Sequence, residues 1–322
     1  MVDFRPFRNS DPPAVRRLWH ECGLGRGAAT EWDADVIETV VFSQPYFDPA
    51  GLILAEVDGQ AVGFVHAGFG PSENRTAIDC RTGVICAVMV APPFRRQGIG
   101  RELVRRAEQY LSGRGAEVIL AGGAEPNDPF YVGIYGGSQP AGFLESDQLA
   151  APFFSAVGYV PGSRRVVYQR SLESRNDPIG LRLMGIRRTT RLAPLEQSDP
   201  HDWWWQTRTG RLDVVELALV PKSGGEPLAS VSVVGLDFYL PRWQQRSIGL
   251  LELHVPERLR KKGYAQALLV EVCRRVREEM ITLVEAHVAA DDPGVQRVFE
   301  SAGFKPVDAG VVYRLRDGVP AA

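Results

Sequence analysis

The stretch that decides the fold occurs twice in the chain: residues 95–100 read Arg-Arg-Gln-Gly-Ile-Gly, and residues 260–265 read Arg-Lys-Lys-Gly-Tyr-Ala. The copies begin 165 residues apart (260 − 95), and we call them the first and second cradle loops. Each follows an apolar segment typical of a buried strand and precedes an amphipathic segment typical of a helix. A glycine-rich turn that opens a helix presents unpaired backbone N–H groups at the positive end of the helix dipole. Each cradle loop is therefore predicted to bind a pyrophosphate group.

Other phosphate-binding motifs do not fit these loops. The chain has no G-x-x-x-x-G-K-[ST] motif, which excludes a P-loop, and no G-x-G-x-x-G after its first strand, which excludes the dinucleotide-binding fingerprint. The pattern that remains is R-x-x-G-x-G/A, with the leading arginine five residues after Val90 or Val255. One such pattern is weak evidence, whereas two in matching strand–loop–helix contexts predict two phosphate sites of one kind.

A second segment also recurs: residues 153–159 read Phe-Phe-Ser-Ala-Val-Gly-Tyr, and residues 298–304 read Val-Phe-Glu-Ser-Ala-Gly-Phe. A glycine at this place is also typical of any helix C-terminus, so one copy alone decides nothing. Because a copy follows each cradle loop, the pair indicates a repeated domain.

The cradle loops resemble the acetyl-CoA motif of the GNAT superfamily of N-acetyltransferases, and the second repeated segment resembles its L-Y-x-x-x-G-F segment. The resemblance covers nearly the whole chain. It implies an α/β fold, with an α+β mixed sheet, built from two tandem GNAT acyl-CoA N-acyltransferase domains in an arrangement similar to that of mycothiol synthase. It also implies acetyl-CoA as the cofactor. The resemblance does not extend to the substrate, and we hypothesise a small-molecule amine as the acceptor. One half would be mainly catalytic and the other mainly cofactor-binding or structural.

By this resemblance the chain divides into an N-terminal domain at residues 1–172, a linker at 173–182 and a C-terminal domain at 183–322. We call the two domains half one and half two. Strands are expected at residues 3–8, 51–57, 61–68, 85–90, 118–121 and 165–170 in half one, and at 214–220, 228–234, 245–255, 281–289 and 311–315 in half two.

The two halves differ in length at two places. Gly158 and Gly303 lie 145 residues apart (303 − 158), against 165 for the cradle loops, so half one carries about twenty extra residues, which we assign to a loop at 127–143. This insertion is either functional or a surface lid over the trimmed neighbouring domain. Half two is expected to be trimmed at its start, around 196–212, where the family usually places its acceptor-binding helices.

Composition narrows the class of protein. The chain has 322 residues, a net charge of −2 and 24% charged residues, which is typical of a globular protein and gives no footprint for nucleic acid. It has no apolar run near the roughly 20 residues that span a bilayer, and its four cysteines lack zinc-ligand spacing. We therefore expect a cytoplasmic protein with no metal, nucleic-acid or membrane partner.

Acetyl transfer needs a neutral amine, and a general base contributes typically about 10²–10⁴-fold. Strand alternation places Glu252 and His254 on one face of the strand before the second cradle loop, with His287 on the neighbouring strand. Glu252 resembles the general-base glutamate of histone-acetyltransferase-type members, so these three residues are the candidate catalytic group. The alternatives are an arginine-paired carboxylate and two structural histidines. In half one the same face offers Ala87 and Met89, which include no base.

The resemblance also assigns the cofactor-binding residues. Backbone N–H groups near Met89–Val90 and His254–Val255 would hold the thioester oxygen. The full set is Met89, Val90, Arg95, Arg96, Gln97, Gly98, Ile99, Gly100 and Arg101 in half one, and His254, Val255, Arg260, Lys261, Lys262, Gly263, Tyr264 and Ala265 in half two.

The tyrosine that often serves the family as general acid is absent: Phe154 and Phe299 occupy its two positions. Tyr131 and Tyr135 in the insertion are candidate replacements, or the thiolate leaves without protein assistance. Asp147 and Asp292, seven residues before these phenylalanines, replace the family's frequent asparagine and fit helix N-caps better.

Two other hypotheses remain. The chain could be a non-catalytic acyl-CoA-binding or regulatory protein built from two degenerate domains. Alternatively, half one could be the enzyme, with the insertion supplying the acid and the acceptor pocket.

Overall fold

The computed structural model describes residues 1–30, 34–195 and 202–316. Its strands form one continuous mixed sheet in the order β1-β2-β3-β4-β5-β13-β7-β12-β11-β10-β9-β8, with β6 paired to β13. The strands are β1 (Val2–Pro6), β2 (Leu52–Val57), β3 (Gln60–Pro71), β4 (Ile78–Val90), β5 (Val118–Ala121), β6 (Phe143–Leu144), β7 (Tyr159–Ser171), β8 (Thr190–Pro194), β9 (Val214–Pro221), β10 (Ala229–Gly235), β11 (Ser247–His254), β12 (Leu283–Ala289) and β13 (Lys305–Leu315).

Helices cover both faces of the half-one sheet. Leu52 and Leu54 of β2 join the core beneath α1, whereas the alternating Ile53 and Ala55 join the core beneath α3, as the period of two requires. The helices are α1 (Pro12–Cys22), α2 (Ala34–Ile37), the π-helical turn η2 (Glu38–Phe42), α3 (Ile99–Gly113), α4 (Ala150–Ala156), α5 (Leu181–Thr189), α6 (Trp203–Thr209), α7 (Leu240–Trp243), α8 (Tyr264–Glu278) and α9 (Pro293–Ser301), with short 3-10 turns η1 (Gly25–Gly27), η3 (Pro49–Gly51), η4 (Pro92–Phe94), η5 (Asp237–Tyr239) and η6 (Glu257–Leu259).

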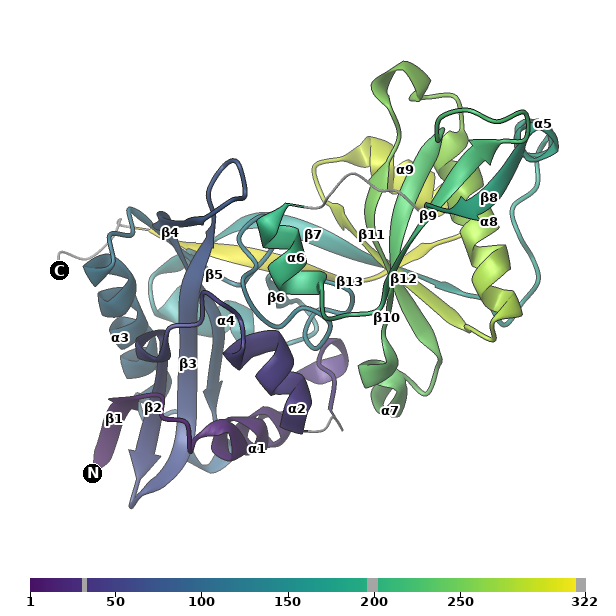
Figure 1. Cartoon of the computed structure of the whole chain (residues 1–322). Coiled ribbons are helices and arrows are strands. Elements are labelled where there is room, and N and C mark those ends of the chain that lie inside the picture. The colour runs from purple at the N-terminus through teal and green to yellow at the C-terminus, as the bar shows by residue number, and fades with distance from the viewer. Residues whose placement is uncertain (31–33, 196–201, 317–322) are drawn as a thin grey trace.

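The two halves exchange their last strands. β13 of half two pairs with β5 of half one, β7 of half one pairs with β12 of half two, and β7 and β13 pair with each other, all antiparallel. Figure 1 shows β7 and β13 side by side between the two halves. The mixed α/β sheet expected from the sequence is confirmed, but the exchange was not expected, because both strands contain the same apolar run, Val-Val-Tyr at 166–168 and at 311–313, and suit either partner.

The expected strands are present, with shifted ends. β7 begins at Tyr159 instead of 165 and β13 at Lys305 instead of 311, because the two strands pair with each other along most of their length. Sequence reasoning missed α5 and β8. Between β8 and β9 the described residues hold one short helix, α6, and residues 196–201 of the expected trimmed region lie outside the described residues.

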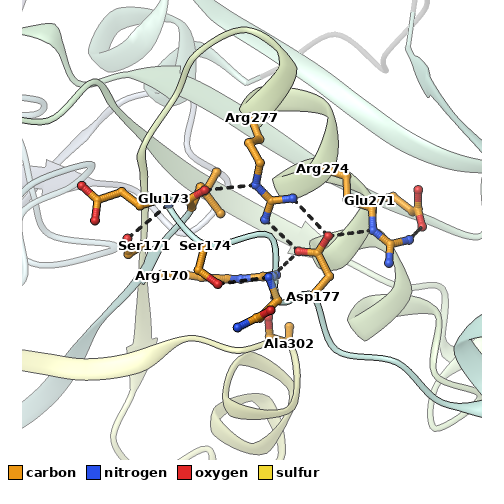
Figure 2. A network of polar contacts seen from close by, with 11 residues as sticks. Arg170, Ser171, Glu173, Ser174, Asp177, Glu271, Arg274, Arg277 and Ala302 are labelled. Atoms are coloured by element: carbon orange, nitrogen blue, oxygen red, sulfur yellow. Dashed lines mark hydrogen bonds and ion pairs between the residues drawn. The ribbon is translucent and has the colours of Figure 1, made fainter.

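An acidic residue fixes the linker to the second half (Figure 2). The Asp177 carboxylate accepts hydrogen bonds from Arg170 on β7 and from Arg274 (3.0 Å) and Arg277 (2.8 Å) on α8. Burial raises the pKa of Asp177, but the hydrogen bonds and charges of the arginines outweigh burial and hold that pKa well below its usual range. The linker is therefore anchored to the helix that follows the second cradle loop.

Candidate functional site

The two cradle loops have the same backbone conformation. Arg96 and Lys261 have φ values of 63° and 61°, and Gly98 and Gly263, which cap α3 and α8, have 85° and 88°. The cap position needs glycine because a side chain is strained at such positive φ. The recurrence of glycine at both caps therefore has a geometric cause, and both helices open toward their loop.

The leading arginine of each loop secures it to the preceding strand. Arg95 donates from Nε to the Val90 carbonyl (2.8 Å), and Arg260 donates in the same way to the Val255 carbonyl (3.3 Å). Each of these side chains therefore ties its cradle loop to the end of the preceding strand. The backbone N–H groups at the helix starts remain as the anion-binding elements.

The two loops differ in what lies over the glycine. A Cβ at Gly98 would meet nothing within 4 Å, whereas one at Gly263 would meet Nε of Arg182 at 2.8 Å. Arg182 comes from α5 and donates to the carbonyls of Lys261 and Lys262. The second loop thus has an additional guanidinium beside its phosphate-binding turn.

Ahead of each cradle loop, the strand that leads into it separates from its parallel neighbour. Pairing of β4 with β5 ends at Ile85 and Ala121, and pairing of β11 with β12 ends at Leu250 and Ala286, while β4 and β11 both continue toward their loops. A gap between strands beside a phosphate-binding turn fits an acyl-CoA molecule, whose amide-containing arm can pair with the strand edge.

A β-bulge interrupts each of these strands. On β11, Leu251 and His254 oppose Ser232 and Ser230, so β11 has one extra residue, and Glu252 there has a φ of 52°. On β4 the extra residue is Cys86. Simple alternation therefore does not hold between Glu252 and His254, and the interruptions lie upstream of the expected Met89–Val90 and His254–Val255. A non-glycine residue at positive φ in a strand is uncommon and is typical of functional sites.

Half two has a cavity of about 200 Å³ that starts where β11 and β12 part. Glu252 and His287 both line it, whereas the exposed His254 is outside the set of described residues that do. The lining residues are Glu125, Gln139, Arg165, Trp205, Arg208, Leu250, Leu251, Glu252, Leu253, His287, Val288, Ala289, Asp292, Val295 and Phe299. Another cavity, of about 250 Å³, lies at the opposite end of β5 from the first cradle loop.

Half one contributes much of the wall of this half-two cavity. Glu125 and Gln139 belong to the segment after β5, and Arg165, which pairs with Glu125 at 3.4 Å, is on β7. Arg208 of α6 forms a buried ion pair with Asp128 of the insertion. The insertion thus packs against half two, the neighbouring domain that a lid was expected to cover.

His287 has a partner that sequence reasoning missed. Its side chain is buried, and Nε2 lies 3.3 Å from Oε1 of Glu285, which is also buried. Nδ1 has no hydrogen-bond partner among the described residues. The signal was available in the sequence: residues 283–289 read Leu-Val-Glu-Ala-His-Val-Ala, in which an acid and a histidine share one face of an apolar strand.

The corresponding face of half one is filled. Ala87 and Met89 are buried in one core cluster with Trp19, Phe130 and Tyr131, of which the last two come from the insertion. The Trp19 and Tyr131 rings stack at 5.4 Å between centroids. Packed apolar and aromatic side chains therefore occupy this face beside the first cradle loop's strand.

The insertion's tyrosines are held inside the protein. The Tyr131 hydroxyl is 2.9 Å from Nδ1 of His66, and the Tyr135 hydroxyl accepts from the Leu144 amide (3.2 Å). Burial raises the pKa of both tyrosines and lowers that of His66 to about 3. His66 is therefore neutral at physiological pH, and sequence reasoning had not singled it out.

The two phenylalanines at the general-acid positions pack as core residues. Phe154 stacks on Tyr313 at 5.2 Å, and Phe299 lines the half-two cavity and stacks on Tyr168 at 6.1 Å. Asp292 accepts from the Val295 amide (2.9 Å) as the N-cap of α9. The Asp147 carboxylate accepts from the Leu149 amide (3.0 Å) just before α4.

Comparison with known proteins gives the same class as the loops and the diverging strands. The model of the acetyltransferase (GNAT) family matches the chain twice, over residues 13–134 and 182–304. The chain therefore belongs to the GNAT acetyltransferase family, as two tandem domains. An acetyltransferase of Pectobacterium atrosepticum is 31% identical over 134 residues, which cover 42% of this chain and 84% of that protein.

Solved structures share the fold over the whole chain. A tandem GNAT protein from the clavulanic acid biosynthesis pathway matches with a TM-score of 0.68 and 18% identity, over 100% of both chains. A GCN5-related N-acetyltransferase from Sphaerobacter thermophilus matches with a TM-score of 0.63 and 18% identity, over 99% of this chain and 97% of that one. At such identity the likeness concerns the fold.

Two other kinds of site are absent from the part of the chain that the structure describes. None of its helices is long and apolar enough to cross a membrane. Within the same ranges, no cluster of three or more His, Cys, Asp or Glu side chains is arranged to hold a metal ion.

Proposed function

We propose that this protein transfers the acetyl group of acetyl-CoA to a small-molecule amine in half two, and that half one mainly binds the cofactor. The observation that carries the proposal is the cavity between β11 and β12, set against the filled face of half one. The volume of about 200 Å³ suits a small acceptor. The lining carboxylates Glu125, Glu252 and Asp292 suit an amine that arrives as a cation.

In this proposal the cradle loops hold the phosphates. Backbone N–H groups at the starts of α3 and α8 bind them, and Lys261, Lys262 and Arg182 add positive charge in half two. When bound, acyl-CoA supplies an activated acyl group as a thioester. The residues of both loops given by the sequence remain the proposed contacts.

Glu252 is the proposed general base. Its carboxylate lines the cavity at the bulge, where it can take the proton from the incoming amine, and His287 lines the same cavity as a relay. We give His254 no catalytic role because it lies outside the cavity lining. With phenylalanine at position 299, the departing thiolate is protonated by water.

The test is a Glu252→Gln variant assayed by thiol release with acetyl-CoA and a panel of primary amines. We expect turnover to fall by about 10²–10⁴-fold, while acetyl-CoA affinity measured by calorimetry stays unchanged. Glu278→Gln, an exposed carboxylate at the end of α8, is the matched control. Wild-type turnover in Glu252→Gln would show that Glu252 is not the base.

A second candidate function is a non-catalytic acyl-CoA-binding or regulatory protein. Phenylalanine at both general-acid positions, 154 and 299, favours it. Calorimetric binding of acetyl-CoA without thiol release for any amine in the panel would support this candidate over the first.

A further inference from the structure

A chain of buried polar contacts joins half one to His287. Oε1 of Glu285 accepts from the Ser138 amide (3.0 Å) and lies 3.3 Å from Nε2 of His287. Oε2 of Glu285 accepts from Nε2 of Gln169 (2.8 Å), whose Oε1 accepts from Arg26 (2.7 Å). Ser138, Gln169 and Arg26 all come from the half-one sequence, so a carboxylate of half two is held by groups of half one.

Glycines in both halves make this close approach possible. A Cβ at Gly137, which has a φ of 96°, would meet Oε1 of Glu285 at 1.6 Å, and one at Gly249 of β11 would meet Cβ of Ser138 at 2.2 Å. The tip of the insertion is also tied by Tyr239 of half two, whose hydroxyl accepts from the Gly137 amide (2.9 Å) and donates to the Gly27 carbonyl (3.1 Å). The insertion is thus docked against β11 and β12 by backbone shape as well as by hydrogen bonds.

The contact with Glu285 sets the state of the His287 ring. A carboxylate accepts hydrogen bonds, so Nε2 of a neutral His287 carries the proton and Nδ1 is left as the acceptor. Nδ1 is buried and has no partner among the described residues, and His287 lines the cavity. The ring nitrogen that remains for a substrate proton is therefore Nδ1.

We propose that Glu285 is a positioning residue for His287 and that half one supplies its supports, the Ser138 amide and the Gln169–Arg26 pair. The inference rests on the proposed acetyl transfer in half two. It means that the insertion, which fills the face of half one, also completes the catalytic site of half two. Half two would then depend on half one both for the groups that hold Glu285 and for β7, the strand that pairs with β12.

The other charged groups facing His287 are known from the cavity lining. They are Glu252 on β11, Arg165 on β7, Glu125 after β5, Arg208 on α6 and Asp292 at the start of α9. Arg165 is paired with Glu125, and Arg208 with Asp128, so these charges are partly balanced among themselves. Among these charged groups and Glu285, it is Glu285 that lies within 3.3 Å of the ring, so removing its charge should have the largest effect on the state of His287.

The test combines NMR of the histidine side chains in the full chain with kinetics. Nitrogen-15 shifts of His287, assigned with a His287→Gln variant, should show the Nε2–H tautomer in the wild type. In Glu285→Gln the share of the Nε2–H tautomer should fall, because the carboxylate that accepts from Nε2 is gone. Glu108→Gln, a buried carboxylate of α3 that accepts from the Tyr159 hydroxyl (2.9 Å), is the matched control and should leave His287 unchanged.

Kinetics decide whether the contact serves catalysis. Glu285→Gln should lower kcat/KM for thiol release at least tenfold, with acetyl-CoA affinity unchanged. Gln169→Ala keeps the Glu285 carboxylate but removes the hydrogen bond that Gln169 Nε2 donates to it. This variant should give smaller changes in the same measurements, and it replaces Glu285→Gln as the test if that variant does not fold.

An unchanged His287 tautomer in Glu285→Gln would overturn the proposal. A changed tautomer with an unchanged rate would overturn the positioning role as well. If no amine were acetylated, the proposed function would fail, whereas the nitrogen-15 shifts would still decide whether Glu285 holds His287.

Discussion

The two halves have matching cradle loops and unlike faces beside their diverging strands. Gly98 and Gly263 cap their helices at nearly the same φ, and Arg95 and Arg260 brace the loops in the same way. In half one, however, the face beside the diverging strands is packed with aromatic side chains, whereas in half two it is a cavity lined by Glu252 and His287. Backbone geometry makes the binding loop, and side chains decide whether a half can carry out chemistry.

The insertion accounts for both sides of this difference. Its residues Phe130 and Tyr131 fill the face of half one, and Gln139 lines the cavity of half two. α6 is the one helix described between β8 and β9. Residues of half one complete the wall of the half-two cavity. The exchange of β7 with β13 joins the two halves in one sheet, although their side chains beside the cradle loops differ.

The largest stability effect is expected at the linker, which braces the second cradle helix. Asp177→Ala should lower the free energy of unfolding by about 3 kcal/mol, because it removes the shared anion of Arg170, Arg274 and Arg277 and, among the described residues, leaves only Arg274 with another carboxylate, that of Glu271. Urea unfolding at neutral pH measures the loss. The effect should fade as pH falls below about 3.8, since the folded-state pKa of Asp177 is lowered and its stabilisation is lost on protonation.

The matched control for the linker is Asp79→Ala. Asp79 forms an ion pair with Arg81 at 2.5 Å, and the Arg81 side chain is largely exposed. An exposed pair of this kind contributes little. If Asp79→Ala and Asp177→Ala shifted the urea midpoint equally, the linker clamp would have no special role.

His66 tests the packing of the half-one face through pH. Its pKa is lowered by burial from 6.5 to about 3, so its contribution to stability is fully present above pH 6.5 and is lost as pH falls toward 3. Between pH 7 and pH 4 the wild type should lose about 3 kcal/mol more unfolding free energy than His66→Gln. Denaturant titrations at the two pH values measure this difference. Equal losses would mean that water reaches the ring and that the face is open.

The smallest effect is expected for Tyr131→Phe, which tests whether half one is the enzyme. The change removes the hydroxyl from His66 Nδ1 and should cost about 1–2 kcal/mol of stability. Thiol release should stay within twofold of the wild type, because Tyr131 is packed against Trp19 away from the half-two cavity. A tenfold or greater loss of turnover in a folded variant would instead assign the general acid to the insertion.

The sequence was informative wherever a local rule decides the structure. The cradle loops were predictable because positive φ demands glycine at 98 and 263, and the hairpin between β2 and β3 turns at Asp58 and Gly59, both at positive φ. The spacing of Glu285 and His287, two residues apart on one strand, also indicates that their side chains share a face. Sequence reasoning missed this pair.

Long-range features were beyond the sequence. Neither the exchange of β7 with β13 nor the packing of Phe130 over Ala87 leaves a local pattern, because each depends on contacts between segments far apart in the chain. The bulge at Glu252 could not be predicted either. Side-chain alternation does not hold across a strand that contains one extra residue, and the sequence does not mark where that residue lies.

The central claim is that both halves bind the cofactor and half two carries out the transfer. Calorimetric titration of acetyl-CoA and thiol release should be measured together in the wild type, Gly98→Glu and Gly263→Glu, with the two alanine variants as controls for backbone strain at positive φ. We predict two binding sites in the wild type, the loss of one site in each glutamate variant, and the loss of thiol release in Gly263→Glu alone. One site that disappears only in Gly98→Glu, or thiol release that survives in Gly263→Glu, would contradict this account.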